Sequence, residues 1–266
     1  MNEFTHFFQW QVEKPGLFSP FHFISLLIII VSTILVSKIF KNCSYLTYKK
    51  IIIFSWLFLV ILEIIKQLVK SFYYGPPSYW EYSFYNLPFH LCSTIYYIAP
   101  ILLFMNKDKH PKIYNALIGF MGIFVLMAGS IVILYNDIVM SEMLFTNIQS
   151  MAHHGVQVIL GVFIVVWNKK QYNFKTFLSS LIVLAIFTII ALLINIIIAP
   201  FGGIDMFYVN PYEITVLPIG SYIQENFGFI PYFIVYLIVI ILGGFITYSI
   251  EILSIHKFNF KKIFMK

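Results

Sequence analysis

Long apolar runs alternate with short polar segments along the whole chain. Seven such runs lie at roughly 21–40, 50–72, 87–105, 112–135, 151–168, 175–200 and 229–253. A bilayer core about 30 Å thick is crossed by about 20 helical residues. The runs are continuous and do not alternate with a period of two, so they predict helices rather than barrel strands. We therefore expect an all-α membrane bundle of about seven transmembrane helices, with residues 1–266 forming one integral membrane domain.

Composition supports a chain that is mostly surrounded by lipid. Hydrophobic residues make up 60% of the sequence and charged residues only 11%, with a mean hydropathy of +0.88. A water-soluble domain needs roughly a quarter of its residues charged. The first twenty residues carry Glu3, Glu13 and a single Lys14, which is unlike a cleavable signal peptide. The two cysteines, Cys43 and Cys92, are expected on opposite sides of the membrane and therefore unpaired.

Lysines mark one side of the predicted membrane. Every basic residue is Lys, and most lie in the loops after the first, third and fifth runs and in the tail: Lys38, Lys41, Lys49, Lys50, Lys107, Lys109, Lys112, Lys169, Lys170, Lys175, Lys257, Lys261, Lys262 and Lys266. The positive-inside rule places the N-terminus outside and the C-terminus in the cytoplasm, and we expect a multi-pass protein of the cell membrane. The net charge of +6 is then a topology signal and a contact to anionic lipids. We expect membrane lipids as partners and no nucleic acid.

The sequence also predicts a packing seam in the fourth run and a long loop after the sixth. Asn115, Gly119, Gly122 and Gly129 lie near one face of the fourth run, which is typical of a close-packing seam without chemistry. The longest loop, 201–228, is predicted to be extracellular. Gly202, Gly203, Pro211 and Pro218 are expected to prevent helices there, and the loop is a candidate lid.

The second run carries an intramembrane ion pair. An ionisable side chain in a membrane span costs several kcal/mol unless it is paired or hydrated, so it marks a candidate functional site. Glu63 and Lys66 are three residues apart and therefore share a helix face. Trp56, Gln67 and Lys70 lie near the same stripe. The alternative is an ion pair that only fixes helix packing.

The third run begins with a candidate nucleophile. Asn86 is a plausible helix cap and Pro88 suits a first turn, which would place His90 and Cys92 near a helix N-terminus. The partial positive charge there favours a thiolate. Residues two apart point about 200° away from each other on a regular helix, so His90 is a poor direct base for Cys92. The alternative for Cys92 is a small buried apolar residue.

The fifth and sixth runs add further polar groups. His154 and Gln157 share a face, and His153 neighbours Gln157. The two histidines with Glu63 could bind a metal, but adjacent histidines rarely ligate one ion, so we assign no metal and no cofactor. Asn195 is a lone amide near the outer end of the sixth run. Its alternative role is an interhelical hydrogen bond.

The predicted topology brings these groups to one depth. Glu63, Lys66 and Asn195 fall in the outer halves of outward-running helices. Cys92 and the histidine pair fall in the first turns of inward-running helices. The inner half is expected to hold no comparable set, since Glu251 lies close to the cytoplasm. One outward-facing polar pocket is therefore the interpretation that we favour.

The run Leu87-Pro88-Phe89-His90-Leu91-Cys92-Ser93 resembles the Leu-Pro-x-His-Leu-Cys signature of the bacterial YwaF-like integral membrane proteins. Glu63, the His153-His154 pair and Asn195 followed by 208–211 also resemble that family's layout. The loop after Asn195 departs from the family's Asn-Tyr pattern, because Tyr208 precedes Asn210 here. These proteins are similar to the eukaryotic transmembrane protein 164 family, whose members are implicated as cysteine-dependent phospholipid acyltransferases. The resemblance implies that Cys92 carries an acyl group and that His153 or His154 is its base.

Two functions therefore remain open on the sequence. The first is phospholipid acyl transfer or transacylation, with Cys92 as nucleophile, His154, His153 and His90 as catalytic candidates, and Glu63, Lys66, Gln157 and Asn195 around the substrate. The second is binding or transport of a small polar solute by the intramembrane ion pair and the histidines. The lack of an inverted repeat or a clearly broken helix counts against transport.

Overall fold

Helices account for nearly every apolar run. The computed structural model describes residues 2–73 and 76–255, so the tail lysines from Lys257 onward lie outside the described residues. Six helical segments are long and apolar enough to cross a membrane: α2 (Pro20–Phe40), α3 (Tyr45–Ser71), Pro111–Leu134, α7 (Leu144–Trp167), Phe174–Phe201 and α10 (Phe229–Ile255). A shorter apolar helix spans Leu91–Phe104. The structure thus confirms a polytopic all-α bundle, whereas the seventh crossing and the in–out orientation stay predictions.

Local sequence signals explain where several helices begin. The Ser19 hydroxyl accepts from the backbone N–H of His22 at the start of α2, where Pro20 occupies the first turn. Ser44 caps α3 in the same way, by accepting from the N–H of Thr47. Asn173 begins α8 (Phe174–Ile198) with a reciprocal capping box, in which the Thr176 hydroxyl accepts from its backbone.

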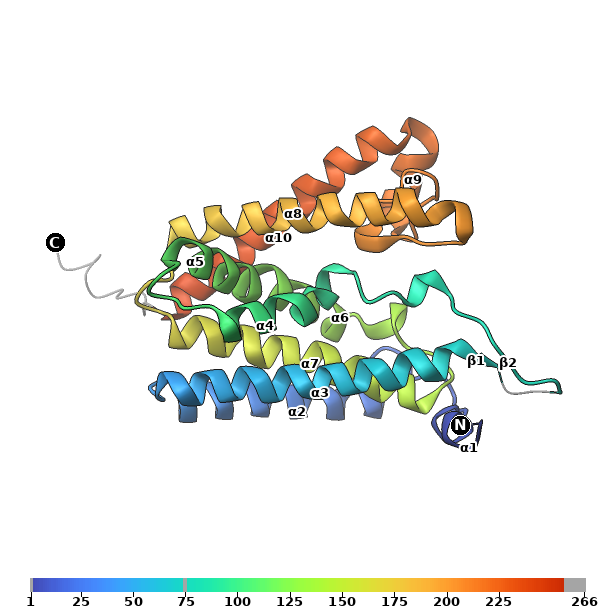
Figure 1. Cartoon of the computed structure of the whole chain (residues 1–266), viewed down its shortest axis with the longest axis horizontal. Helices are drawn as coiled ribbons and strands as arrows, with labels where there is room; N and C mark the ends of the chain where they lie inside the picture. The colour runs from blue at the N-terminus through green and yellow to red at the C-terminus, as the bar shows by residue number, and fades with distance from the viewer. Residues whose placement is uncertain (1, 74–75, 256–266) are drawn as a thin grey trace.

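The helix α7 lies at the centre of the bundle. It contacts α2, α3 and α6 (Leu126–Leu134), as Figure 1 shows for the lower half of the molecule. α5 (Pro111–Phe120) packs on α8, and α10 crosses behind them at an angle. The peripheral helices α2, α3, α8 and α10 expose many large aliphatic side chains, whereas Pro111–Leu134 and α7 are the most buried of the six. Such exposed apolar faces are expected of helices that face lipid.

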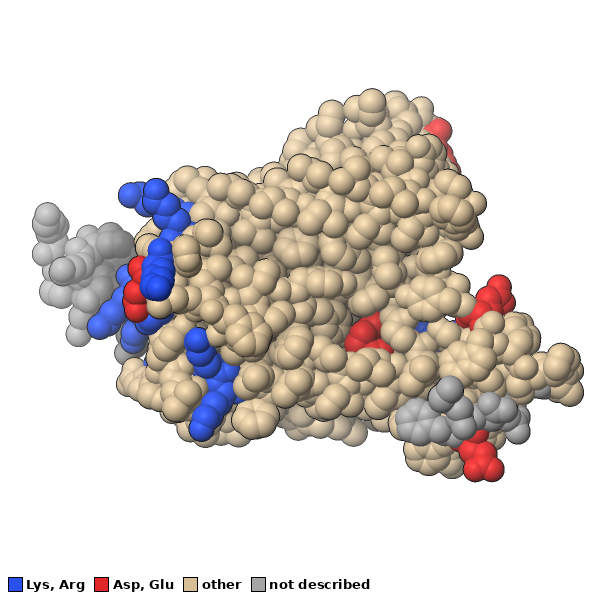
Figure 2. All heavy atoms as spheres, viewed as in Figure 1, with Lys and Arg blue, Asp and Glu red and all other residues tan. Residues whose placement is uncertain are grey.

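Charged side chains gather at the two ends of the bundle. In Figure 2 most of the visible lysines lie at the end where α3 begins and α7 ends, and most visible acidic groups lie toward the other end. The short helix α1 (Asn2–Phe8) lies at that second end, opposite the end of α10 (Figure 1). The apolar band between the ends is the feature that a membrane-spanning arrangement requires.

The third apolar run becomes helical only at Leu91, four residues after the expected start near residue 87. A hairpin of β1 (Phe72–Tyr73) and β2 (Tyr79–Trp80) leads into the 3-10 turn η1 (Phe84–Asn86). Four non-helical residues follow before the 3-10 turn η2 (Leu91–Thr94) and α4 (Ile95–Phe104). Asn86 is therefore not a helix cap. Pro88 is not in a first helical turn either, because His90 immediately before η2 is still extended.

Side chains satisfy two backbone carbonyls of the segment before η2. The Gln67 amide donates to the carbonyl of Asn86, and the Tyr97 hydroxyl donates to that of Pro88 at 2.9 Å. Non-helical backbone at membrane depth is tolerated only where protein or water satisfies it. The non-helical residues 87–90 lie immediately before η2, the turn that contains Cys92.

The small residues of Pro111–Leu134 form the predicted packing seam. A Cβ added at Gly119 would lie 2.7 Å from the carbonyl of Thr176 on α8. One added at Gly129 would lie 2.9 Å from the Gln157 amide oxygen on α7. The middle of this crossing is the π-helical turn η3 (Met121–Val125) between α5 and α6. Because Gly129 adjoins Gln157, the face to which we assigned no chemistry borders the polar groups.

The helix α7 begins at Leu144, seven residues before the predicted start of the fifth run. Its first two turns, LFTNIQS, mix apolar and polar residues, so hydropathy alone did not predict this part of the helix. The Asn147 side chain accepts from the backbone N–H of Ser141 and donates to its carbonyl, both at 2.8 Å. Buried polar groups are tolerated when they are hydrogen-bonded, and this turn meets that condition.

The segment after α8 is folded onto the bundle. It contains the 3-10 turns η5 (Ala199–Phe201) and η6 (Met206–Tyr208) and the helix α9 (Pro218–Phe227). Pro218 begins α9 rather than breaking a helix, because proline suits the first helical turn. The buried Asn195 amide donates to the carbonyl of Met206 at 3.0 Å and accepts from its N–H at 2.8 Å. This pair of bonds anchors the predicted lid to α8.

The lysine-rich end also holds buried polar groups, which corrects the expectation of an inner half without a polar set. The Tyr172 hydroxyl donates to Glu251 at 2.5 Å. The Asn168 amide donates to the hydroxyl of Tyr48 at 3.3 Å and accepts from that of Tyr114 at 3.4 Å. The predicted depth in the membrane therefore does not by itself distinguish the polar groups around Cys92 from those at the lysine-rich end.

We predict that Asn195→Leu destabilises the fold. The substitution leaves the N–H of buried Met206 without a partner, and its carbonyl keeps only the bond from the Val209 N–H, at a cost of about 1 to 3 kcal/mol. The variant should unfold at a clearly lower temperature than the parent protein in detergent. Asn226→Leu is the matched control, because the exposed Asn226 makes only a bond to Tyr222 within α9. Equal unfolding temperatures for Asn195→Leu and the parent would contradict the anchoring role.

Candidate functional site

Cys92 lies beside the histidine pair of α7. Cys92 lies in η2, and α7 carries His153 and His154 near its middle, where the helix is buried. The thiol and one ring nitrogen of each histidine all lie within 4.8 Å of one another. Both histidines are 5% exposed, and Cys92 as a whole residue is partly buried. The thiol and the two imidazoles thus form one compact cluster.

The Gln157 amide holds the three residues together. Its nitrogen donates to the carbonyl of Cys92 at 2.8 Å and to Nε2 of His153 at 2.6 Å. Its oxygen lies 3.3 Å from Nδ1 of His154. An amide oxygen only accepts, so this network assigns a hydrogen to Nδ1 of His154 and leaves its Nε2 with a free lone pair. The same network makes Nε2 of His153 an acceptor.

Tyr96 connects His153 to the ion pair of α3. Its hydroxyl lies 3.0 Å from Nδ1 of His153 and 3.2 Å from Oε2 of Glu63. With the hydrogen of His153 on Nδ1, the ring donates to Tyr96 and Tyr96 donates to Glu63. The other Glu63 oxygen accepts from Lys66 at 2.8 Å and from Gln67 at 2.6 Å. The carboxylate thus orients a histidine through the tyrosine rather than directly.

The loop after α8 covers the His90 side of Cys92. The rings of His90 and Tyr208 pack with their centroids 5.4 Å apart, and Phe89 packs on Phe207. Phe207 and Tyr208 both have positive φ, near +57°, which non-glycine residues rarely adopt. Nδ1 of His90 has no hydrogen-bond partner among the described residues. Burial raises the pKa of the Tyr208 hydroxyl, which lies outside the spans, to about 12.

The structure brings most, but not all, of the predicted site residues together. Cys92, His153, His154 and Gln157 form one cluster, and Glu63 and Lys66 join it through Tyr96. Among the described contacts, none links Asn195 to this cluster, because its amide bonds Met206. Sequence reasoning missed Tyr96, although its position four residues after Cys92 places it on the same helical face.

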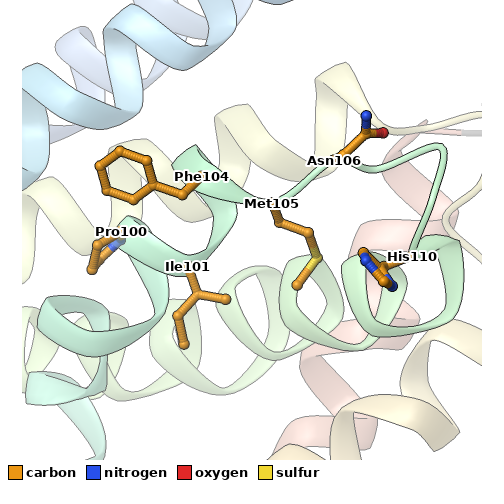
Figure 3. Close-up of a pocket in the computed structure, with 6 residues that line it drawn as sticks. All are labelled: Pro100, Ile101, Phe104, Met105, Asn106 and His110. Carbon is orange, nitrogen blue, oxygen red and sulfur yellow. The ribbon is translucent and has the colours of Figure 1, made fainter.

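A surface groove lies elsewhere. It is lined by Pro100, Ile101, Phe104, Met105, Asn106 and His110, between the end of α4 and the start of α5 (Figure 3). Cys92 lies before the other end of α4. The groove is therefore not the predicted outward pocket, and its lining offers only His110 as a titratable group.

Comparison with known proteins places this arrangement in a family. The model of the TMEM164 family matches residues 17–248, which include every residue of the cluster. The chain belongs to the TMEM164 family. This match confirms the resemblance to the transmembrane protein 164 family, whereas the likeness to YwaF-like proteins stays a prediction from residues 87–93. No curated protein and no solved structure matches the chain.

Asp205 is the titrating group of the loop in this TMEM164-family protein. It is 3% exposed, and its Oδ1 accepts from the backbone N–H of Asn210 at 3.1 Å. Burial, opposed by that bond and reinforced by nearby Glu213, raises the pKa of Asp205 from 3.8 to about 6. The folded loop therefore binds a proton between pH 4 and 6 that the unfolded loop has already released.

We predict that the loop loses stability as pH rises from about 4 to about 6. A raised carboxyl pKa contributes stability below the unfolded value and loses it as pH passes the folded value, here by at most about 3 kcal/mol. The hydrogen-exchange protection factors of residues 204–210, which remove the intrinsic rise of amide exchange with pH, should fall across this window. Asp205→Asn should remove that pH dependence. A parent protein whose exchange protection is flat or increases over the window would contradict the assignment.

Proposed function

We propose that this TMEM164-family protein is a cysteine- and histidine-dependent acyl transfer enzyme for phospholipids, working from the side of the membrane opposite the lysine-rich end. The observation that carries the proposal is the Cys92 thiol with ring nitrogens of His153 and His154 within 4.8 Å. Hydrogen bonds between nucleophile and base are often long before substrate binds, so this spacing suits a resting enzyme. The family resemblance implies the same chemistry.

His154 is the proposed base. Nε2 of His154 takes the thiol proton, and Sγ attacks the ester carbonyl carbon of a phospholipid to form a tetrahedral oxyanion. The C–O bond then breaks, and the lysophospholipid oxygen leaves with the proton from His154, which produces a thioester on Cys92. The hydroxyl of an acceptor lipid attacks the thioester, His154 takes its proton and returns it to the thiolate, and Cys92 is regenerated.

Neighbouring residues supply the other parts of this reaction. Gln157 keeps His154 in the required tautomer through its amide oxygen. His90, with Nδ1 unpartnered among the described residues, is a candidate donor to the oxyanion. Lys66, whose side chain is 20% exposed, and the exposed Lys70 are candidate contacts for the lipid phosphate. Asn195, which anchors the loop, is no longer our candidate for direct substrate contact.

We predict that a lipid-like electrophilic probe labels Cys92 selectively in membranes. Cys92→Ser should abolish labelling, and His154→Ala should slow it by about 10²- to 10⁴-fold, the usual contribution of a general base. Cys43→Ser is the matched control, because Cys43 lies between α2 and α3 at the other end of the bundle. Labelling of folded protein that does not need His154, or no labelling at all, would contradict the proposal.

We also predict that Tyr96→Phe slows labelling while leaving the fold intact. The ring keeps its packing, but the link from Glu63 to His153 is lost. If Tyr96 only positions His153, the rate should fall by about tenfold with little change in probe affinity, whereas loss of His154 remains more severe. Varying the probe concentration separates the maximal labelling rate from the affinity for the probe. A Tyr96→Phe protein with parental kinetics would remove Tyr96 and Glu63 from the mechanism.

Solute transport is the second candidate function. The buried Glu63–Lys66 pair and the non-helical segment before Cys92 are features that transporters place around their substrates. A zwitterionic solute would match the pair. Uptake into proteoliposomes that depends on Glu63 and persists in Cys92→Ser would favour this function over acyl transfer.

A further inference from the structure

The nitrogen and sulfur atoms around Cys92 have the composition of a transition-metal site. Cys92, His153 and His154 each offer one ligand atom, and these atoms lie within 4.8 Å of one another. In a tetrahedral zinc site with bonds of about 2.0 to 2.3 Å, neighbouring ligand atoms are about 3.3 to 3.6 Å apart. The three atoms therefore need to approach one another by at most about 1.5 Å, which small rotations of the Cys92 and histidine side chains can supply.

The histidines are held as metal ligands usually are. A metal-bound histidine almost always donates its other ring N–H to an oxygen, which fixes the ring and the tautomer. Nδ1 of His154 faces the Gln157 oxygen at 3.3 Å, and Nδ1 of His153 faces the Tyr96 hydroxyl at 3.0 Å. Both Nε2 atoms thus keep their lone pairs. Binding through Nε2 of His153 replaces its present bond from Gln157.

We propose that Cys92, His153 and His154 bind one Zn²⁺ ion reversibly, and that the ion blocks acyl transfer by capturing the thiol. Thiolate and imidazole ligands select zinc rather than magnesium or calcium. The thiol proton is released to solvent when the Zn–S bond forms. Three protein ligands leave the fourth position to water. The inhibitory effect rests on the proposed function, whereas the binding itself does not.

Cobalt tests the site without any assay of activity. Co²⁺ added to the purified protein in detergent should give the near-ultraviolet thiolate-to-cobalt absorption and the visible bands of a tetrahedral site, and Zn²⁺ should displace both. Cys92→Ser should lose the thiolate band. Cys43→Ser should keep it. Gln157→Leu, checked for folding by thermal unfolding, should weaken Co²⁺ binding by about 10- to 100-fold, because the His154 ring loses its hydrogen bond to the Gln157 oxygen.

Protection from the electrophilic probe links the two proposals. Zn²⁺ should stop labelling of Cys92, and a chelator should restore it. A cobalt spectrum without a thiolate band, or one unchanged in Cys92→Ser, would overturn the metal site. Absence of cobalt binding by folded protein would also overturn it. If the thiolate band forms but Cys92 is never labelled, the metal site stands and acyl transfer fails.

Discussion

The hydrogen bonds of the Gln157 amide are the interactions on which the rest of the site depends. One side chain joins the backbone of Cys92 to both histidines of α7, so it fixes the distance between the third crossing and α7. In a bilayer, each of these groups would cost several kcal/mol if left unpaired. Gly129 leaves room for the amide, because a Cβ there would lie 2.9 Å from its oxygen. Packing and hydrogen bonding therefore select the same geometry.

The late start of the third helix follows from the same constraint. A continuous helix from residue 87 would satisfy its own backbone and would present His90 and Cys92 on opposite faces. Along residues 86–92, side chains supply three bonds instead: Gln67 of α3 donates to the carbonyl of Asn86, Tyr97 of α4 to that of Pro88, and Gln157 of α7 to that of Cys92. These bonds offset part of the cost of non-helical backbone at membrane depth.

The sequence predicted much of this arrangement, because the periodicity of membrane helices is strong. Hydropathy located all six long helices, and the spacing of Glu63 and Lys66 predicted the ion pair that the structure shows. It could not predict the start of α7 at Leu144, since the polar first turn is stabilised by bonds to Ser141 that are invisible to hydropathy. The hydrogen bonds between Asn195 and Met206 were not predictable from the sequence for a related reason. A lone amide can bond any nearby backbone, and only the folded loop decides which.

Base and metal ligand are not independent roles for His154. A base for Cys92 needs an Nε2 lone pair near the thiol, and a tetrahedral metal needs the same lone pair and the same sulfur. The Gln157 oxygen favours both by placing the hydrogen on Nδ1. What separates the two outcomes is which partner occupies the position beside the Cys92 sulfur, a lipid ester or a metal ion. A thiol held beside two imidazoles is therefore open to binding by thiophilic metals for the reason that makes it suited to acyl transfer.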